Sequence, residues 1–376
     1  MDALRPETLH KLEQNDPSLT KITLGHQWNG INADHFTRLG KAIATNSHLK
    51  ELEVDVYRSA LKETEIDLFH GIKQNSSIQK LKLICGSRNI IGTSAHEILM
   101  AYQHENNNLT RLIIQHAGLQ NGGHLAVVNT LRCCKNLRII QLSCDITDEL
   151  LLPMVEAMKG SQTLEDLELG RNRIGNDGCE TIATLLRHPN CNLQYLDLSS
   201  NQIGDDGAIA IANSLANNSK LKCIYLLNNS IGEKVMDILS KVLCDTSSIN
   251  AAYSSNHTLQ QIVFSFRSSS VCSYLLGLNA RDANKRNVAM KKILKYHPNI
   301  NMEPLFEFEK GERTLKGLPC VIDWFEEAKT VTDGGDALVD QQKLSAIYQF
   351  ALAMPLLFIP TEHTKGRDIK RKRADI

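Results

Sequence analysis

The stretch LEDLELGRNRIGNDG at residues 164–178 returns as LQYLDLSSNQIGDDG at residues 193–207, with its apolar residues at the same positions. In both copies an apolar triplet with the spacing i, i+3, i+5 precedes an Asn-x-Ile-Gly-x-x-Gly pattern. The alternation in the triplet is typical of a short strand with one buried face, and the spacing of Ile182, Leu185 and Leu186 is typical of an amphipathic helix. Each copy is therefore predicted to form one strand, one turn and one helix.

The same apolar triplet recurs through most of the chain. Its first residues are Leu19, Leu49, Ile78, Leu109, Leu137, Leu164, Leu193 and Leu221, so the units are 27–31 residues long. A period near 28 residues is that of a long leucine-rich repeat. Because one unit alone cannot cover its apolar stripe, neighbouring units are expected to stack. The predicted fold is an α/β right-handed leucine-rich-repeat solenoid (horseshoe) with a parallel concave sheet, a helical convex side and a helical C-terminal cap.

An Asn follows most of the quoted triplets and is predicted to hold the turn after the strand. It lies eight positions after the start of the repeat at Asn172, Asn201 and Asn229. Asn29 and Asn89 take this place in longer repeats, and Cys144 takes it in a shorter one. The Asn amide both donates and accepts hydrogen bonds, so it can pair backbone groups that have left the sheet. We therefore expect Asn201→Leu to destabilise the fold more than Asn176→Leu, because Asn176 is predicted to lie on the outer side.

The pattern also predicts the domain organisation. Residues 1–18 are expected to form an N-terminal helical cap, with a helix at residues 6–14. Residues 19–266 hold about nine repeats, the last modified by an inserted loop at residues 252–257. Residues 267–360 are expected to form a helical capping region, with helices at residues 284–296, 315–328 and 341–358. Residues 361–376 read as a disordered basic tail.

Composition excludes several classes of function. The 42 basic and 42 acidic residues balance, so no whole-chain field draws the protein to nucleic acid or to a membrane. No signal sequence or membrane-spanning run is recognised, and the ten cysteines lack metal-ligand spacing and are interpreted as reduced structural thiols. We expect no cofactor, metal or small-molecule substrate, and a cytoplasmic location. The cluster Lys370, Arg371, Lys372 and Arg373 adds nuclear import as an alternative.

The Asn-x-Ile-Gly-x-x-Gly pattern at residues 172–178 and 201–207 resembles that of the ribonuclease-inhibitor-like leucine-rich repeats. This resemblance covers about residues 1–266 and implies an intracellular horseshoe that binds proteins. The segments LPCVIDW at residues 318–324 and YQFALAMP at residues 348–355 resemble the ends of uncharacterised leucine-rich-repeat proteins of single-celled algae. The Ran GTPase-activating protein shares the fold, but its array ends in an acidic region whereas this tail is basic, and its active Asn and Arg have no match here.

Alternation along the strands predicts which side chains face into the arc. A basic stretch through Lys80, Lys82, Arg111 and Arg138 is followed by an acidic stretch through Glu165, Asp166, Glu168 and Asp197. Tyr195 and Tyr225 lie beside the acidic stretch, and exposed tyrosines on a rigid sheet are favoured interface anchors. The candidate partner-binding residues are Arg111, Arg138, Asp166, Glu168, Arg171, Tyr195, Asp197, Tyr225 and Leu227. A solvated surface without a partner is the alternative for this patch.

These observations predict a non-enzymatic scaffold or adaptor that binds one protein on its concave face. Asp166 and Glu168 would sit on a flat strand row, which favours solvated side chains over an acid–base pair. No phosphate loop, nucleophilic triad or nucleotide fingerprint is recognised. Nucleic acid is disfavoured by the acidic half of the arc. A GTPase regulator of the Ran GTPase-activating type stays open as the alternative function.

Overall fold

In the computed structural model, the described residues are 6–25, 33–56, 66–85, 98–100, 108–115, 123–265, 269–297, 308–309 and 312–313. The chain divides into two compact units. The first comprises Met1–Asp245 and Ser254–Lys285, and the second comprises Thr246–Tyr253 and Arg286–Ile376. The sheet and its candidate site belong to the first unit, and the second unit is treated separately below.

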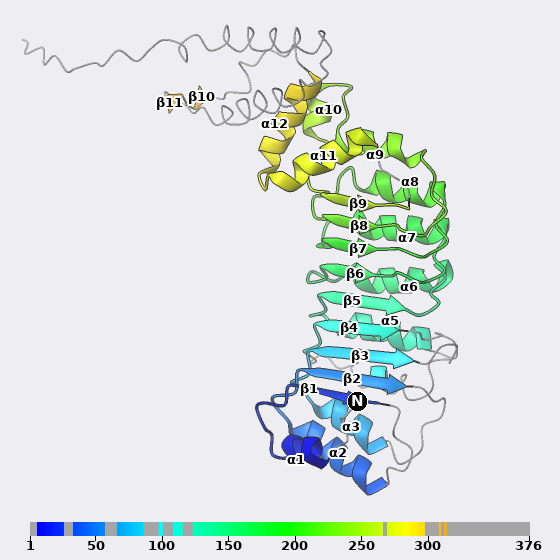
Figure 1. Ribbon diagram of the computed structural model, residues 1–376, viewed down its shortest axis with the longest axis vertical. Coiled ribbons are helices and arrows are strands. Elements are labelled where there is room, and N and C mark those ends of the chain that lie inside the picture. Colours follow the sequence, from blue (N-terminus) through cyan, green and yellow to red (C-terminus); the bar gives the residue numbers. More distant parts are fainter. Residues whose placement is uncertain are drawn as a thin grey trace, which may run out of the picture. The chain divides into compact units, whose positions relative to one another are not determined.

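Nine strands of the first unit form one sheet whose order follows the sequence from β1 to β9, and every neighbouring pair is parallel (Figure 1). The strands are β1 Lys21–Leu24, β2 Glu51–Val56, β3 Lys80–Cys85, β4 Arg111–Gln115, β5 Ile139–Ser143, β6 Asp166–Glu168, β7 Tyr195–Asp197, β8 Cys223–Tyr225 and β9 Gln261–Val263. Leu167 aligns with Leu196, and Leu196 aligns with Ile224. The predicted repeat register is therefore confirmed.

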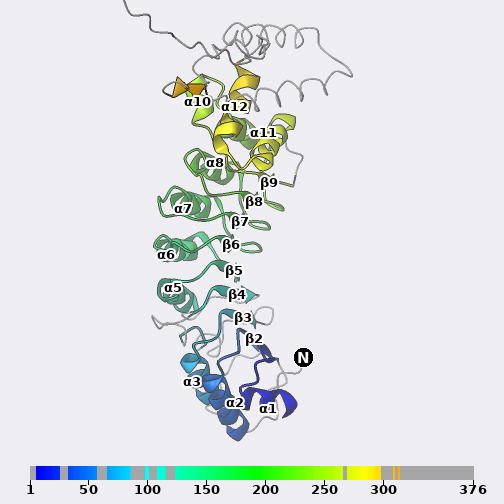
Figure 2. The same cartoon turned by 90° about the vertical axis from the view of Figure 1, so that its left-hand side faces the viewer.

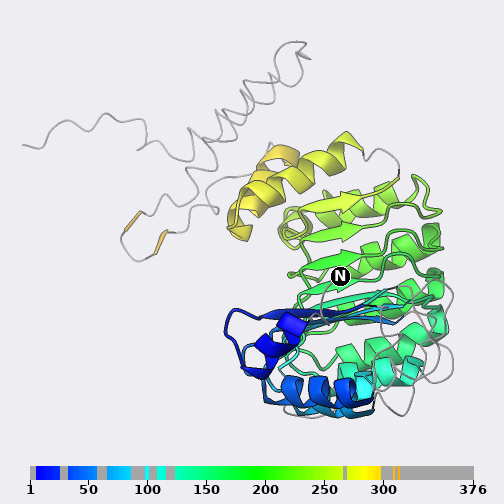
Figure 3. The same cartoon turned by 60° about the horizontal axis from the view of Figure 1, so that its bottom comes forward.

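A helix follows most strands and lies on one side of the sheet, as Figure 2 shows. The helices of the first unit are α1 Pro6–Glu13, α2 Ala33–Thr45, α3 Ile66–Gln74, α5 Gly123–Cys133, α6 Asp148–Met158, α7 Asn176–Leu186, α8 Asp205–Ser214, α9 Val235–Leu243 and α11 Ser270–Arg281. Neighbouring helices from α5 to α9 contact each other. At the N-terminal end, α1 packs against α2, and Figure 3 brings this end forward.

The core is a ladder of aliphatic side chains between the sheet and the helices. Leu52, Leu81, Leu112, Leu167 and Leu196 occupy the same strand position in five repeats and are all fully buried. Removing apolar surface from water stabilises the fold by roughly 25 cal/mol per Å². Because the ladder is completed only when repeats stack, the stability of each repeat depends on its neighbours.

The Asn after each strand pairs backbone groups of two repeats. The Asn172 amide donates to Leu142 O and Leu169 O, both at 2.8 Å, and its Oδ1 accepts from Cys144 N and Ile146 N at 2.9 and 3.0 Å. Asn201 and Asn229 make the equivalent bonds one and two repeats further on. In the shorter repeat the Cys144 thiol reaches Ile114 O at 3.5 Å. Asn29 and Asn89 lie outside the described residues.

A second ladder joins the starts of successive helices. Asp148 Oδ1 accepts from Gly175 N at 2.7 Å, Asn176 Oδ1 accepts from Gly204 N at 2.9 Å, and Asp205 Oδ1 accepts from Gly232 N at 2.6 Å. Asn176 is exposed, as expected for an outer position, but its side chain accepts from Gly204 N and Gly207 N of the next repeat, so Asn176→Leu removes hydrogen bonds as well. A Cβ at Gly207 would stand 2.7 Å from Asn176 Oδ1, which explains the second Gly of the repeated pattern.

A third ladder in the return loops was missed by the sequence analysis. The buried Asn75 amide donates to Ile43 O and Asn46 O, and Asn75 Oδ1 accepts from Ser77 N and Ile78 N. Asn256 makes the same set of bonds near the other end of the array, to Leu215 O and Asn218 O. Asn is common in exposed loops, so its presence there did not indicate burial. The available signal was its recurrence three positions before the first apolar residue of a strand triplet, as in Asn75 before Ile78 and Asn256 before Leu259.

The C-terminal region differs in detail from the sequence expectations. A helix at α11 had not been predicted, and its Ser269 side chain caps it by accepting from Cys272 N. In the second unit, α10 Ile249–Tyr253 covers the start of the expected loop at residues 252–257. Helix α12 Lys285–Tyr296, of which all but Lys285 belong to the second unit, coincides with the predicted helix at residues 284–296. The two-residue strands β10 Phe308–Glu309 and β11 Glu312–Arg313 pair antiparallel. The predicted helices at residues 315–328 and 341–358 lie outside the described residues, as does the basic cluster at residues 370–373.

Eight cysteines lie in the described part of the chain, and six of them are buried. Cys133, Cys134, Cys144, Cys179, Cys191, Cys223, Cys244 and Cys272 are thiols and form no disulfide. Burial raises the pKa of the Cys179 thiol to about 12, so it remains protonated at neutral pH. Among the described residues, no group of three or more His, Cys, Asp or Glu side chains is placed to hold a metal ion. No described helix has both the length and the apolar character needed to cross a membrane.

Candidate functional site on the open face of the sheet

The face of the sheet opposite the helices, here called the open face, carries two rows of side chains. The strand register aligns the first row as Lys21, Glu51, Lys80, Arg111, Ile139, Asp166, Tyr195, Cys223 and Gln261. It aligns the second row as Thr23, Glu53, Lys82, Ile113, Gln141, Glu168, Asp197, Tyr225 and Val263. Because stacking fixes the backbone, these side chains are presented in a preset order.

Lysines and glutamates at the N-terminal end of the open face neutralise each other. Lys80 Nζ lies 2.9 Å from Glu51 Oε2, and Lys82 Nζ lies 2.8 Å from Glu53 Oε1. Burial alone would raise the pKa of Glu53, but hydrogen bonds from Lys82 and Lys21 hold this pKa below its usual value. Two members of the predicted basic stretch, Lys80 and Lys82, are therefore already paired within the chain.

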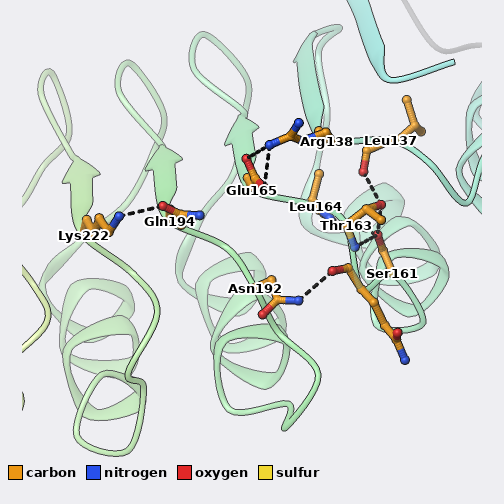
Figure 4. A network of polar contacts seen from close by, with 10 residues as sticks. Leu137, Arg138, Ser161, Thr163, Leu164, Glu165, Asn192, Gln194 and Lys222 are labelled. Atoms are coloured by element: carbon orange, nitrogen blue, oxygen red, sulfur yellow. Dashed lines mark hydrogen bonds and ion pairs between the residues drawn. The ribbon is translucent and has the colours of Figure 1, made fainter. Parts of the chain in front are cut away.

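Arg138 lies outside the two rows, one residue before β5. Its Nη2 contacts both carboxylate oxygens of Glu165 at 2.8 Å, and one repeat further on Lys222 Nζ donates to Gln194 Oε1 at 2.8 Å (Figure 4). Arg138, Glu165, Gln194 and Lys222 thus form an edge row beside the starts of the strands. The expectation that Arg138 points into the arc is corrected: it compensates Glu165 in this row, a surface pairing worth about 0–1 kcal/mol.

Below the edge row, side chains pair the backbone of the return loops. Thr163 Oγ1 donates to Leu137 O at 2.8 Å, and Ser161 Oγ accepts from Leu164 N at 3.2 Å (Figure 4). Asn192 Nδ2 donates to Gln162 O at 2.6 Å. The bonds of Thr163 and Asn192 reach the preceding repeat, so they join repeats at the edge of the sheet as well as in the core.

The C-terminal half of the open face gathers aromatic rings and carboxylates. Asp166 is the strand neighbour of Tyr195, and Asp197 is the strand neighbour of both Glu168 and Tyr225. The rings of Tyr195 and Tyr225 lie 5.2 Å apart, centroid to centroid, with an interplanar angle of 36°. We call these five residues the tyrosine–carboxylate patch.

Burial and neighbouring carboxylates raise the pKa values of three groups in the patch. Burial and then the neighbouring Glu165 raise the pKa of Asp166, while burial and then Asp197 raise the pKa of Glu168. Burial and Asp197 also raise the pKa of Tyr195 to about 12. Arg111 and Arg138 oppose the shift at Asp166 without cancelling it. Among the described residues no ion pair to Asp166 or Glu168 forms, in contrast to Glu51 and Glu53.

The other candidate residues lie around this patch. Arg111 is on β4, two strands from Asp166, and its Nε is buried without a hydrogen-bond partner among the described residues. Arg171 and Leu227 follow the ends of β6 and β8, where Arg171 adopts a left-handed backbone with φ of 62°. The nine predicted residues therefore lie in four places: the patch, β4, the edge row and the segments that follow β6 and β8.

Neutralising Asp166 and Glu168 together is expected to raise the midpoint of thermal unfolding at pH 7. Both folded-state pKa values are raised, so the folded chain binds more protons than the unfolded chain and its stability falls as pH rises through that window. Asp166→Asn with Glu168→Gln should add on the order of 1–2 °C at pH 7, the scale of partly exposed charges. The gain should vanish near pH 3, below the ordinary pKa values of 3.8 and 4.5.

The matched control removes the same charge from the helical side. Asp177→Asn with Glu180→Gln changes two exposed carboxylates of α7. Melting curves followed by circular dichroism at both pH values compare the two variants. An equal gain in the control would assign the effect to net charge instead of the patch.

Comparisons with known proteins agree with this architecture. A family described as "Leucine Rich repeat" matches residues 160–183 and 190–212, the two units that contain β6 and β7. The solenoid is built of leucine-rich repeats. Human "NACHT, LRR and PYD domains-containing protein 14" is 29% identical over 177 residues, 44% of this chain and 15% of that protein. The bovine "NACHT, LRR and PYD domains-containing protein 9" is 26% identical over 197 residues, 52% of this chain and 20% of that protein.

This chain spans a fifth or less of the length of these relatives. Among solved structures, the "tropomodulin C-terminal domain" of Caenorhabditis elegans is 17% identical, with a TM-score of 0.35 over 42% of this chain and 93% of that chain. "Leiomodin-1 Actin-Binding Site 2" is 20% identical, with a TM-score of 0.33 over 42% of this chain and 87% of that chain.

Proposed function

We propose that this chain is a non-enzymatic protein-interaction module, a scaffold or adaptor, that binds one protein partner through the tyrosine–carboxylate patch on the open face of its leucine-rich-repeat sheet. The single observation that supports the proposal is that, in the described part of the chain, charged side chains are paired at one end of the open face and unpaired beside the tyrosines. Toward the N-terminus, charges are paired within the chain, whereas β6 to β8 present a tyrosine pair beside carboxylates that lack ion pairs among the described residues. The repeat pattern at residues 172–178 and 201–207 supports a ribonuclease-inhibitor-like subtype.

The physical argument is preorganisation. Fixing a flexible side chain on binding costs about 0.5–1.5 kcal/mol, and much of this cost is absent where the ring is already packed. Tyr195 and Tyr225 are half-buried and contact each other, and the strands beneath them are held by the ladders of Asn201 and Asn229. Tyrosines in such a setting are frequent binding hot spots. The same flat arrangement offers no group positioned to act on a substrate, which favours recognition over catalysis.

The test compares two double variants of the full chain. Tyr195→Ala with Tyr225→Ala should weaken partner binding by at least tenfold, the effect of losing a hot spot. The control, Leu125→Ala with Leu152→Ala, truncates side chains that are 56% and 53% exposed on α5 and α6, and it should leave binding unchanged. Partners recovered with the wild-type chain are purified, and their affinities for each variant are measured by calorimetry.

Folding of each variant is checked first by circular dichroism. Full affinity of a folded Tyr195→Ala/Tyr225→Ala variant would contradict the assignment of the patch. Loss of binding in the control but not in the tyrosine variant would place the interface on the helical side instead.

A further inference from the structure

The two tyrosines of the patch have the same surroundings, shifted by one strand. In the first row Tyr195 stands between Asp166 on β6 and Cys223 on β8. In the second row Tyr225 stands between Asp197 on β7 and Val263 on β9. Each ring therefore has a carboxylate on one flank and a less polar side chain on the other. Neighbouring strands are about 4.8 Å apart, so each ring and its carboxylate are close enough to contact one side chain of a ligand together.

We propose that the tyrosine–carboxylate patch recognises arginine side chains of a cationic, extended peptide segment of its partner; this inference rests on the proposed function. A guanidinium group is planar, stacks on an aromatic ring and donates two parallel hydrogen bonds to a carboxylate. The pairs Tyr195 with Asp166 and Tyr225 with Asp197 supply both halves of this contact. An ammonium group uses the charge but gains less from the planar ring and the two carboxylate oxygens.

Charge complementarity limits the site to this part of the open face. Glu51 and Glu53 are already paired with Lys80 and Lys82, so an incoming cation would have to displace a neighbouring lysine there. At the patch, burial is the largest cause of the raised pKa values of Asp166 and Glu168, and repulsion from a neighbouring carboxylate, Glu165 for Asp166 and Asp197 for Glu168, raises them further. A bound guanidinium would relieve this repulsion. An anionic ligand such as a phosphate or nucleic acid would increase it.

The spacing also fits a peptide in the extended conformation. Alternate residues of an extended chain point to the same side and are about 7 Å apart. The two ring–carboxylate pairs lie on adjacent strands and in adjacent rows, so two arginines in an Arg-x-Arg pattern are expected to bind better than one. This spacing defines the probe.

The experiment measures fluorescence anisotropy of a fluorescein-labelled peptide, Gly-Arg-Gly-Arg-Gly-Arg-Gly, with the full chain at an ionic strength of about 0.15 M. The comparison peptide carries lysine in place of each arginine, so it has the same charge. We expect saturable binding of the arginine peptide and at least about threefold weaker binding of the lysine peptide. Asp166→Asn with Asp197→Asn, which neutralises the carboxylate of each pair, should weaken the arginine complex about tenfold, whereas Asp177→Asn with Glu180→Gln on α7 should not.

Two tyrosine variants separate stacking from hydroxyl chemistry. Tyr195→Phe with Tyr225→Phe keeps both rings and should retain most of the affinity for the arginine peptide, whereas Tyr195→Ala with Tyr225→Ala should lose it. Equal binding of the two peptides, together with equal loss in the patch and α7 charge variants, would overturn the proposal in favour of nonspecific attraction. Absence of saturable binding up to millimolar peptide would overturn it as well.

The peptide experiment and the partner-binding experiment can fail independently of each other. If the arginine peptide fails to bind but the alanine variant of the tyrosines loses the purified partner, the interface stands and its ligand is not arginine. If the arginine peptide binds the patch but the purified partner binds the Tyr195→Ala/Tyr225→Ala variant with full affinity, arginine recognition is supported and the proposed interface is contradicted.

Discussion

Asn201→Leu is expected to lower the free energy of unfolding by about 3 kcal/mol. The Asn201 amide donates to Leu169 O and Leu198 O at 2.9 Å, and its Oδ1 accepts from Ile174 N at 3.0 Å. Leucine has a similar size but can pair none of these backbone groups, and each unpaired buried group costs about 1–3 kcal/mol. Because two of the bonds reach the preceding repeat, the loss weakens the stacking of repeats as well as one turn.

The control for this change is Asn213→Leu on α8. Asn213 is exposed, and the same substitution there should change stability by no more than about 0.5 kcal/mol. Asn176→Leu is not suitable as a control, because the Asn176 side chain accepts from Gly204 N and Gly207 N. Urea unfolding followed by circular dichroism measures the free energy of unfolding of Asn201→Leu and Asn213→Leu. Equal losses for Asn201→Leu and Asn213→Leu would reject the turn ladder as a main source of stability.

Gly71→Ala is expected to destabilise the N-terminal repeats by about 3 kcal/mol, at the upper end of the range for overpacking. Gly71 on α3 and Gly40 on α2 let the two helix backbones approach directly. A Cβ at Gly71 would overlap the carbonyl oxygen of Gly40 and would lie 2.7 Å from Gly40 Cα. Backbone atoms cannot rotate aside as a side chain does, so the helices would have to separate and expose buried residues such as Leu68 and Ile72.

Gly277→Ala on α11 is the matched control, since a Cβ there meets nothing within 4 Å. In an unobstructed helix, alanine is favoured over glycine by about 1 kcal/mol, so this variant should be as stable as the wild type or more stable. The two substitutions are chemically identical and both lie inside helices. Thermal unfolding that ranks Gly71→Ala equal to Gly277→Ala would show that the α2–α3 contact is looser than described.

Much of the architecture was available from the sequence because the spacing is strict. The triplets at residues 164, 193 and 221 can bury their leucines on one face only if the strands align in one register. The nine-strand sheet in the described residues has that register. The equivalence of Cys144 to the turn Asn was also readable from the sequence, and its thiol reaches the carbonyl of the preceding repeat.

The candidate site was only half predictable. Alternation placed Asp166, Tyr195 and Tyr225 on one face correctly, because side-chain direction depends on local backbone geometry. Alternation could not show which charges pair, since Lys80 and Glu51 are 29 residues apart in sequence. It also misplaced Arg138, because the strand begins one residue later, at Ile139.

By itself, the sequence determined the repeat, the register of the strands and the face on which each strand residue lies, because these follow from the periods of helices and strands. Only the tertiary structure decided which neighbours meet across repeats. It pairs Lys80 with Glu51 and Lys82 with Glu53, and it lets the Asn176 side chain accept a hydrogen bond from Gly204 N. It also places Gly71 in direct contact with Gly40, while the carboxylates beside the tyrosines form no ion pairs among the described residues. These outcomes depend on distances between stacked units, which a pattern along one chain does not contain.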